Sequence, residues 1–199
     1  MTSIISDGMF SHLMPQPEEQ LKELLETVSA SESVLPELKR LLPAFETCLR
    51  DGNKILACGN GGSATDSMHL VEELVGRYRG DRRSLPAVSL NGDASVMSCI
   101  ANDWDFDHVY CRQVEGLGRR GDMLVAFTTS GNSTNIFKAL ETAKAGGLIT
   151  VAFMGKDGGR CKGIADFEII IPSKNTARIQ EMHTWLLHVM LEYVEECFN

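Results

Sequence analysis

The stretch from Lys54 to Arg77 constrains the fold more than any other part of the chain. Its apolar start, ILAC at residues 55–58, leads into GNGGS at residues 59–63, and apolar residues then recur at helical spacing from Ala64 onward. This pattern predicts a strand, a turn (the glycine turn, residues 59–63) and a helix in succession. Three glycines within four positions let the backbone take positive φ angles and approach a ligand closely. The helix behind them offers unpaired N–H groups to an anion.

The same predicted helix carries a titratable pair, His69 and Glu73, four residues apart and therefore on one face. The pair can serve a ligand held by the glycine turn as acid and base or as metal ligands. It can equally be an exposed i,i+4 pair that stabilises the helix by only a few tenths of a kcal/mol. No lysine follows the glycines, which excludes a Walker A loop, and the absence of G-x-G-x-x-G excludes the common dinucleotide fingerprint.

The composition indicates one globular domain. With 199 residues, the chain is long enough for one substantial core and short for two ordinary domains, so residues 1–199 are interpreted as a single domain. Hydrophobic residues make up 43% and charged residues 23%, values that exclude disordered and fibrous classes. The net charge of -8 argues against a nucleic acid partner. A local nest of amides can still hold a phosphorylated small molecule in an acidic protein.

Cysteine usage and hydropathy indicate a cytoplasmic location. The six cysteines lie apart, without C-x-x-C spacing and mostly inside apolar runs, which is typical of buried thiols in a reducing compartment. The sequence shows no signal-peptide pattern, and no window approaches the roughly 18 apolar residues of a spanning helix. We therefore expect a soluble protein that is not exported and has no membrane partner.

The N-terminal quarter of the chain predicts an arm followed by two helices. Residues 1–17 show no clear period and are interpreted as a loose arm. Within residues 18–51, leucines recur at helical spacing over residues 18–30 and 36–50, and Ser33 is a candidate cap. Such amphipathic helices ahead of an α/β body must bury their apolar stripes on the sheet or on a partner chain, so they are candidates for homo-oligomer contacts.

Further along the chain, apolar runs alternate with helical patterns. Strands are predicted at residues 86–90, 123–127, 148–153 and 167–171. Helices are predicted from residue 96 to about 102–103, through 136–143 and over 177–197, and an irregular helix is predicted over about 106–117. This alternation predicts an α/β fold with a parallel sheet that is covered on both faces. Ligands of such folds bind beyond the carboxyl ends of the strands, where both the glycine turn and the turn after residue 127 are expected to lie.

The turn after residue 127, TTSGNST at residues 128–134, is the second candidate anion site and is called the Thr128 turn. Four of its hydroxyls, those of Thr128, Thr129, Ser130 and Ser133, surround a glycine just before a helix. Hydroxyls together with free amides suit the oxygens of a phosphate monoester. The alternative is a simple capping motif with Ser133 as N-cap.

The long C-terminal helix contains polar residues in an apolar pattern. Gln180 and His188 lie about 80° apart around the helix axis, so both can face one cleft from different turns. For His183 a buried residue bonded to backbone is the favoured interpretation, and for His188 a core role and a functional role stay open. If Gln180 and His188 met His69 and Glu73, the four would suit zinc or another divalent ion, or acid-base chemistry on a sugar.

Five motifs resemble, in order and spacing, those of the phosphoheptose isomerases in the sugar isomerase (SIS) domain family: GNGGSATDSMHLVEEL, IANDW, TTSGNS, GKDGG and ARIQEMHTWLLHVM. The resemblance covers nearly the whole chain. It implies a three-layer, doubly wound, flavodoxin-like sheet of five parallel strands with N-terminal helices that help to form a homotetramer. It also implies conversion of sedoheptulose 7-phosphate into D-glycero-D-manno-heptose 7-phosphate, an early step towards the activated heptoses of bacterial surface glycans such as lipopolysaccharide.

The resemblance also implies roles for individual residues. The catalytic pair would be Glu73 and His188. Zinc, one ion per subunit in members that carry it, would be bound by His69, Glu73, Gln180 and His188. The substrate would be contacted by Asn60, Gly61, Gly62, Glu73, Asn102, Asp103 and Gln180, and its phosphate by Thr128, Thr129, Ser130 and Ser133.

Two departures from the family pattern stand out. Thr128 replaces the usual serine and keeps the hydroxyl, whereas Ala177 stands where some members have a carboxylate, so any assisting role of that group is absent. One alternative is a non-enzymatic SIS-domain relative that binds the bacterial replication initiator, but that relative lacks the His/Glu pair of the first helix and the second histidine of the last. The other alternative is an isomerase of a different sugar phosphate.

Overall fold

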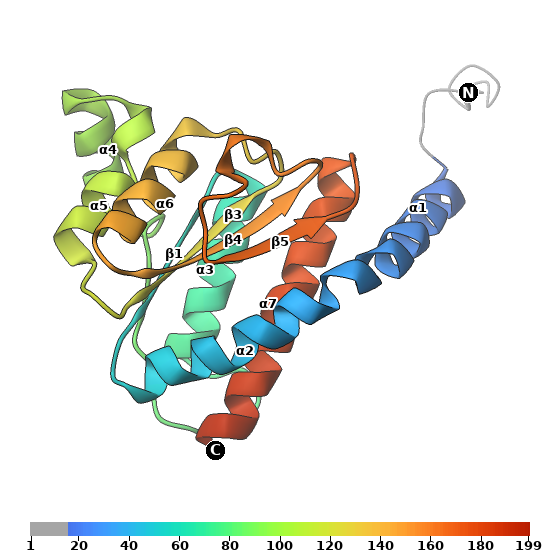
Figure 1. Ribbon diagram of the computed structural model, residues 1–199, viewed down its shortest axis with the longest axis horizontal. Coiled ribbons are helices and arrows are strands. Elements are labelled where there is room, and N and C mark those ends of the chain that lie inside the picture. Colours follow the sequence, from blue (N-terminus) through green and yellow to red (C-terminus); the bar gives the residue numbers. More distant parts are fainter. Residues whose placement is uncertain (1–15) are drawn as a thin grey trace, which may run out of the picture.

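A computed structural model describes residues 16–199 as a three-layer α/β fold (Figure 1). Five parallel strands form one sheet in the order β2-β1-β3-β4-β5, which is the predicted flavodoxin-like order. The strands are β1 (Ile55–Gly59), β2 (Ala87–Ser89), β3 (Met123–Thr128), β4 (Ile149–Gly155) and β5 (Phe167–Ile171). The predicted fold class is confirmed.

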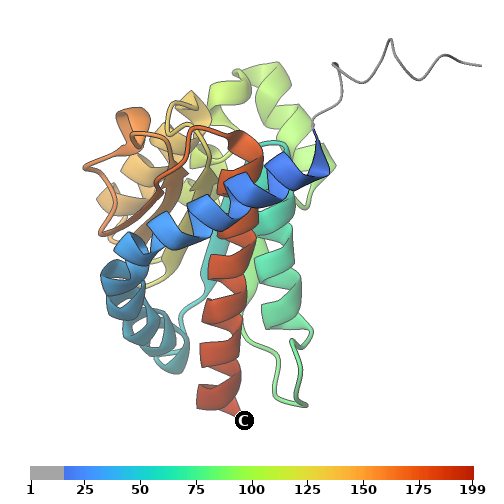
Figure 2. The same cartoon turned by 90° about the vertical axis from the view of Figure 1, so that its right-hand side faces the viewer.

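Helices cover both faces of this sheet. One face packs against α2, α3 and α7, and the other against α4, α5 and α6, which lie together on the opposite side in Figure 1. Helix α1 crosses the N-terminal part of α7, and α3 runs beside α7 (Figure 2). The helices are α1 (Pro17–Ala30), α2 (Leu35–Arg50), α3 (Gly62–Val75), α4 (Ala94–Asp103), α5 (Cys111–Leu117), α6 (Thr134–Ala145) and α7 (Thr176–Phe198).

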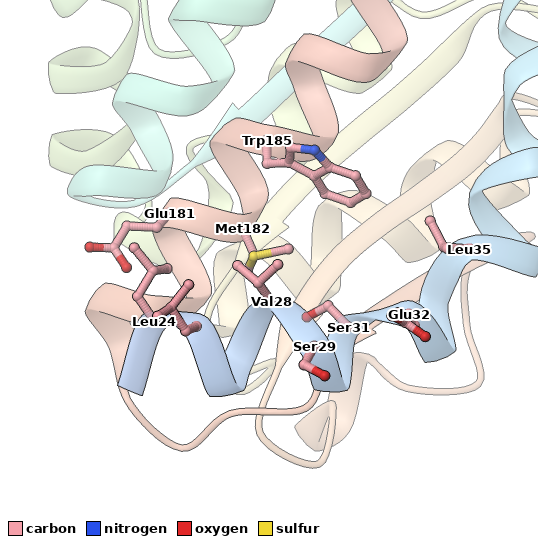
Figure 3. A pocket seen from close by; sticks show the side chains of 10 residues that line it. Leu24, Val28, Ser29, Ser31, Glu32, Leu35, Glu181, Met182 and Trp185 are labelled. Atoms are coloured by element: carbon pink, nitrogen blue, oxygen red, sulfur yellow. The ribbon is translucent and has the colours of Figure 1, made fainter. Parts of the chain in front are cut away.

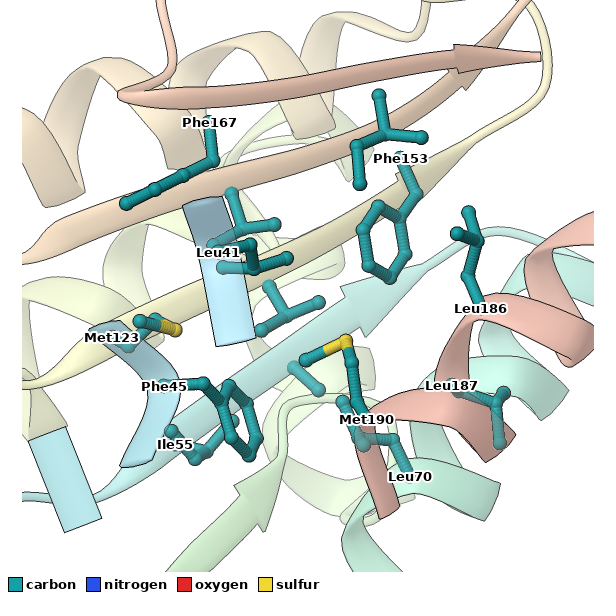
Figure 4. Packing of buried hydrophobic residues seen from close by; sticks show 14 of the residues in the cluster. Leu41, Phe45, Ile55, Leu70, Met123, Phe153, Phe167, Leu186, Leu187 and Met190 are labelled. Atoms are coloured by element: carbon teal, nitrogen blue, oxygen red, sulfur yellow. The ribbon is translucent and has the colours of Figure 1, made fainter. Parts of the chain in front are cut away.

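The core lies on both sides of the strands because side chains alternate between the two faces. Ile55 and Met123 point into the layer with α2, α3 and α7, whereas Leu56 and Leu124 point into the layer with α4, α5 and α6. Figure 4 shows the first layer, in which Phe45 of α2 and Met190 of α7 lie on the same side of the sheet. The apolar runs of β1, β3 and β4 are buried on both faces, as expected for central parallel strands.

The structure corrects the N-terminal prediction at two points. Helix α1 begins at Pro17, so the loose arm predicted for residues 1–17 falls mainly on residues outside the described part of the chain. The two N-terminal helices are joined by a short 3-10 helix, η1 (Ser31–Val34). Ser33 does not cap α2 because its hydroxyl donates to the carbonyl oxygen of Ala30, at 2.9 Å, inside that turn.

Two further predictions can be compared with the structure. The irregular helix predicted over residues 106–117 is a 3-10 helix, η2 (Phe106–His108), followed by α5. The thiols were all expected to be buried, but Cys99 is exposed and Cys197 is half-buried. Within residues 16–199, no helix combines the length and the hydropathy that crossing a bilayer would require.

Candidate active site

A cavity of about 250 Å³ lies beyond the carboxyl ends of β1 and β3. The glycine turn forms one wall and the Thr128 turn forms another, while the first turns of α7 contribute Gln180. This is the edge of a parallel sheet at which ligands of such folds bind. The lining residues are Asn60, Gly61, Gly62, Ser63, Phe127, Thr128, Thr129, Ser130, Ser133, Thr176 and Gln180.

The glycine turn has a backbone conformation that residues with side chains would not adopt. Gly61 precedes α3 with a φ of 56°, in the region that favours glycine. A Cβ atom on Gly59 would collide with the carbonyl of Ser63, and one on Gly62 would collide with the amide of Gln180. The glycines therefore let β1 enter α3 abruptly and let α7 approach the turn.

An amide network holds Asn60 at the cavity wall. Asn60 and Asn135 of α6 exchange two side-chain hydrogen bonds, of 2.9 and 3.0 Å. The hydroxyl of Tyr110 donates to Oδ1 of Asn60 at 3.1 Å, and Asn91 bonds both the N–H and the carbonyl of Gly59. These bracing residues were missed by the sequence analysis, because their roles depend on contacts between distant segments.

Within the described residues, two hydroxyls of the Thr128 turn, those of Thr129 and Ser133, make no hydrogen bond. Oγ1 of Thr128 accepts the N–H of Gly131, and Oγ of Ser130 accepts the N–H of Asn132, each at 3.2 Å. Ser133 occupies the N-cap position of α6, but its side chain makes no capping hydrogen bond. The hydroxyl of Ser133 is thus available to a ligand, and the simple capping interpretation does not account for it.

A second group of predicted residues, His69, Glu73 and His188, is called the helix cluster. Nε2 of His69 lies 3.5 Å from Oε1 of Glu73, and both side chains are partly buried. The ring of His188 on α7 meets that of His69 edge-on, with 5.1 Å between centroids, and the centroid of the Tyr78 ring lies 5.9 Å from that of His188. Two parallel helices thus bring together groups that can accept and donate protons.

The cavity and the helix cluster lie at different levels of the same helix pair. On α7, Gln180 and His188 are eight residues apart, or about 12 Å along the axis. On α3, Gly62 and His69 are separated by about 10 Å in the same way. Gln180 therefore lines the cavity, whereas His188 lies further along α7.

The residues present suit a zinc ion on chemical grounds. His69, Glu72 and Glu73 offer ligand atoms that all lie within 4.8 Å of one another. Imidazole nitrogen and carboxylate oxygen are ligands that zinc accepts, and the ring of His188 adds a further nitrogen next to them. Glu72 was not predicted, although its place beside Glu73 could have suggested it.

Two predicted substrate contacts lie away from the cavity. Asn102 and Asp103 are exposed at the end of α4, where Nδ2 of Asn102 donates to Oδ1 of Asp103 at 2.9 Å. Neither residue lines the cavity. Conversely, the cavity lining adds Ser63, Phe127 and Thr176 to the predicted set.

Two buried titratable groups lie behind the site. Asp66 of α3 accepts a 3.1 Å hydrogen bond from Thr184 of α7, and burial raises the pKa of its carboxyl. His183 is fully buried and bonds the carbonyl of Met154 at 3.1 Å, so the favoured core interpretation is confirmed. Burial lowers the pKa of His183 to about 4, and the ring is neutral at pH 7.

With this geometry in place, the chain can be compared with known proteins. The model of a family described as SIS domain matches residues 18–155. The phosphoheptose isomerase of Fusobacterium nucleatum is 46% identical over 173 residues, which is 87% of this chain and 89% of that protein. The phosphoheptose isomerase of a Nitratiruptor species is 46% identical over 181 residues, 89% of this chain and 97% of that protein.

The chain is also similar to solved structures of phosphoheptose isomerases. The phosphoheptose isomerase of Neisseria gonorrhoeae superposes with a TM-score of 0.85 at 36% identity, covering 90% of this chain and 96% of that one. The enzyme of Francisella tularensis superposes with a TM-score of 0.84 at 29% identity over the same shares. The chain therefore belongs to the SIS domain family and, within that family, to the phosphoheptose isomerases.

Proposed function

We propose that this chain isomerises sedoheptulose 7-phosphate to D-glycero-D-manno-heptose 7-phosphate through an enediol. The observation that carries the proposal is that the cavity of the two turns and the helix cluster both lie along the same pair of packed helices, α3 and α7. An extended seven-carbon sugar phosphate can place its phosphate in the cavity and its carbonyl end at the cluster. The relatives above are phosphoheptose isomerases, so the comparisons do not favour a replication-initiator partner or another sugar phosphate.

The cavity supplies the phosphate site. Hydroxyls of Thr128, Thr129, Ser130 and Ser133 and the amides at the start of α6 face the ligand, and helix N-termini favour anions. Binding energy from the phosphate is remote from the reacting carbons and can be used to orient them. Asn60, Gly61, Gly62 and Gln180 would contact the sugar next to the phosphate.

The helix cluster supplies the proton transfers. Glu73 would take the proton from the carbon next to the carbonyl and return it to the neighbouring carbon. His188 would move protons at the two oxygens, because an imidazole can both accept and donate a proton. His69, 3.5 Å from Glu73, would orient that carboxylate.

As the resemblance implies, His69, Glu73, Gln180 and His188 would be the ligands of a zinc ion, with Gln180 reaching the ion from the cavity wall. When bound, the ion supplies positive charge that stabilises developing negative charge on the substrate oxygens. We further propose that the reaction takes place in the cytoplasm and feeds the activated heptoses of surface glycans such as lipopolysaccharide.

An apolar groove between α1 and α7 supports a homo-oligomer, for which we propose a tetramer. The groove has a volume of about 600 Å³ and is shown in Figure 3, where Leu24, Val28, Met182 and Trp185 project into it. Leu25 and Val28 are 61% and 48% exposed in the single chain. A second copy of the chain would cover these side chains. Light scattering should show a smaller species for Leu25→Glu, whereas Lys22→Glu on the same helix should leave the assembly intact.

The activity is tested with purified protein and sedoheptulose 7-phosphate, with and without a chelator, by following formation of the aldose. We expect turnover, and we expect the chelator to reduce it if zinc takes part. Faster turnover of a hexose or pentose phosphate would contradict the substrate assignment. Saturable binding of sugar phosphate without any turnover would contradict the enzyme assignment.

A further inference from the structure

We propose that Arg82 is a positioning residue that acts with Glu195. The two side chains form a buried clamp that holds Glu73 of α3 opposite His188 of α7. Arg82 lies in the loop after α3 and Glu195 lies near the end of α7. Neither residue belongs to the cavity or the helix cluster.

Arg82 binds the end of α3 directly at the candidate base. Its side chain is fully inaccessible to solvent. Nη2 donates to the carbonyl of Glu73 at 2.6 Å, and Nη1 donates to the carbonyl of Leu74 at 3.0 Å. The last carbonyls of a helix have no partner within the helix, and a cation there is favourable to the helix dipole. Arg82 thus fixes the backbone from which the carboxylate of Glu73 projects.

The other end of the clamp is anchored on α7. Nε of Arg82 lies 3.4 Å from Oε2 of Glu195, whose side chain is only 8% exposed. Oε1 of Glu195 accepts the N–H of Gly80, which lies in the same loop. A Cβ atom on Gly80 would come within 2.9 Å of Oε1, so the loop approaches Glu195 closely there.

The clamp and the cluster share one side of α7. Glu195 follows His188 by seven residues, or two turns, and therefore lies on the same face. The same loop also carries Tyr78, whose ring lies 5.9 Å from that of His188. One segment thus contacts both halves of the candidate catalytic pair. Because a misplacement of about 1 Å can cost on the order of 10²-fold in rate, the clamp can control turnover without touching the substrate.

The chain offers a matched control pair. Arg79 and Glu192 join the same loop to the same helix, with 2.6 Å between Nη2 and Oε1. Their side chains are 67% and 46% exposed, and Arg79 binds no carbonyl of α3 in the described residues. Exposed pairs of this kind contribute little to stability.

The test compares two double variants. Removing one partner of a buried ion pair leaves the other charge buried and unpaired, whereas replacing both by apolar residues of similar length is well tolerated. We therefore compare Arg82→Met/Glu195→Met with Arg79→Met/Glu192→Met, at a temperature well below both melting transitions. For the clamp variant we expect kcat to fall about 10-fold or more with KM within about twofold of wild type. The control variant should keep both values within about twofold.

A second measurement reads the geometry without substrate. In protein with ¹³C-labelled histidine, the ring resonance of His188, assigned with His188→Gln, should shift in the clamp variant, because the nearby ring of Tyr78 moves. The control for this measurement is Glu192→Gln, which breaks the exposed pair but keeps Arg79 over the Tyr78 ring, and it should leave the resonance unshifted. The kinetic readout rests on the proposed function, and this resonance does not. A wild-type protein without turnover would therefore refute the proposed function and leave the clamp to be judged by the resonance.

The inference is overturned by a folded clamp variant with wild-type kcat and an unshifted His188 resonance. If that variant does not fold, Arg82→Lys decides in its place. Lysine keeps the charge but lacks the fork that reaches both the Glu73 carbonyl and Glu195. We expect a reduced kcat at unchanged KM and a shifted resonance for Arg82→Lys, and wild-type values for both would overturn the inference.

Discussion

The cavity is built largely by backbone, whereas the helix cluster is built by side chains on two helices. Positive φ at Gly61 and Gly131 and a missing Cβ at Gly62 shape the cavity, and hydrogen bonds within each turn fix it. The cluster depends on how far α3 lies from α7, because His69 and His188 meet only across that gap. The geometry of the cavity is thus fixed within its two turns, whereas the geometry of the helix cluster depends on the packing of α3 against α7.

This difference predicts separable effects of mutation. Changes in the cavity should weaken binding of the phosphate, which lowers kcat/KM mainly through KM. Changes in the cluster should lower kcat with the fold and the phosphate site intact.

The largest effect is expected for Glu73→Gln. Loss of the general base should lower kcat by roughly 10²-fold or more, with KM little changed because the Thr128 turn is intact. Steady-state kinetics with sedoheptulose 7-phosphate measure both values. Glu141→Gln on the exposed face of α6 is the control for loss of one carboxylate, and it should leave kcat within a few-fold of wild type. Near-normal turnover of Glu73→Gln would remove Glu73 from the mechanism.

An intermediate effect is expected for Ser133→Ala. A hydrogen bond to a charged group contributes about 1.5–3 kcal/mol, so kcat/KM should fall about 10-fold or more. Because the Ser133 hydroxyl makes no capping bond, the Tm should barely change. Asp93→Ala is the contrasting variant, because Asp93 caps α4 through the N–H groups of Ser95 and Val96. That variant should lower the Tm and keep the activity. A Tm loss for Ser133→Ala with full activity would support the capping role instead.

The smallest effect on turnover is expected for His183→Gln, because His183 lies in the core and belongs to neither the cavity nor the helix cluster. The substitution should instead change how the free energy of unfolding depends on pH. Between pH 6.5 and 4, an unfolded histidine binds a proton that the buried ring of His183 does not, because burial lowers its pKa to about 4. The contribution of the neutral ring to the free energy of unfolding is complete above pH 6.5 and is lost as the pH falls towards 4. At about 1.4 kcal/mol per pH unit, the total loss is about 3 kcal/mol.

Urea unfolding at pH 5 and pH 7.5 measures this contribution. Glutamine can still donate to the carbonyl of Met154 but does not titrate, so the stability of His183→Gln should fall less on acidification than that of wild type. Equal losses in the two proteins would show that His183 is not responsible.

The sequence predicted the parts of the site that depend on local order. The glycine turn and the Thr128 turn follow apolar strands in a parallel sheet, so their meeting at one edge follows from the fold class. The pairing of His69 with Glu73 follows from helical spacing. These inferences need only the chain near each motif.

The parts that were missed depend on contacts between distant segments. The Asn60–Asn135 pair joins β1 to α6, and Arg82 meets Glu195 from 113 positions away. Spacing carries no signal for either contact. Spacing likewise carries no signal for the position of Asn102 and Asp103 outside the cavity, because that position depends on how α4 packs and not on their motif.

The most direct test is the reaction in D₂O followed by NMR. For wild-type protein we expect sedoheptulose 7-phosphate to give the aldose heptose 7-phosphate with deuterium at C2, because a proton held by Glu73 exchanges with solvent before it returns to carbon. Glu73→Gln should show neither aldose nor deuterium on the same timescale. Absence of aldose from the wild-type reaction, or wild-type rates in Glu73→Gln, would contradict the proposed isomerase mechanism.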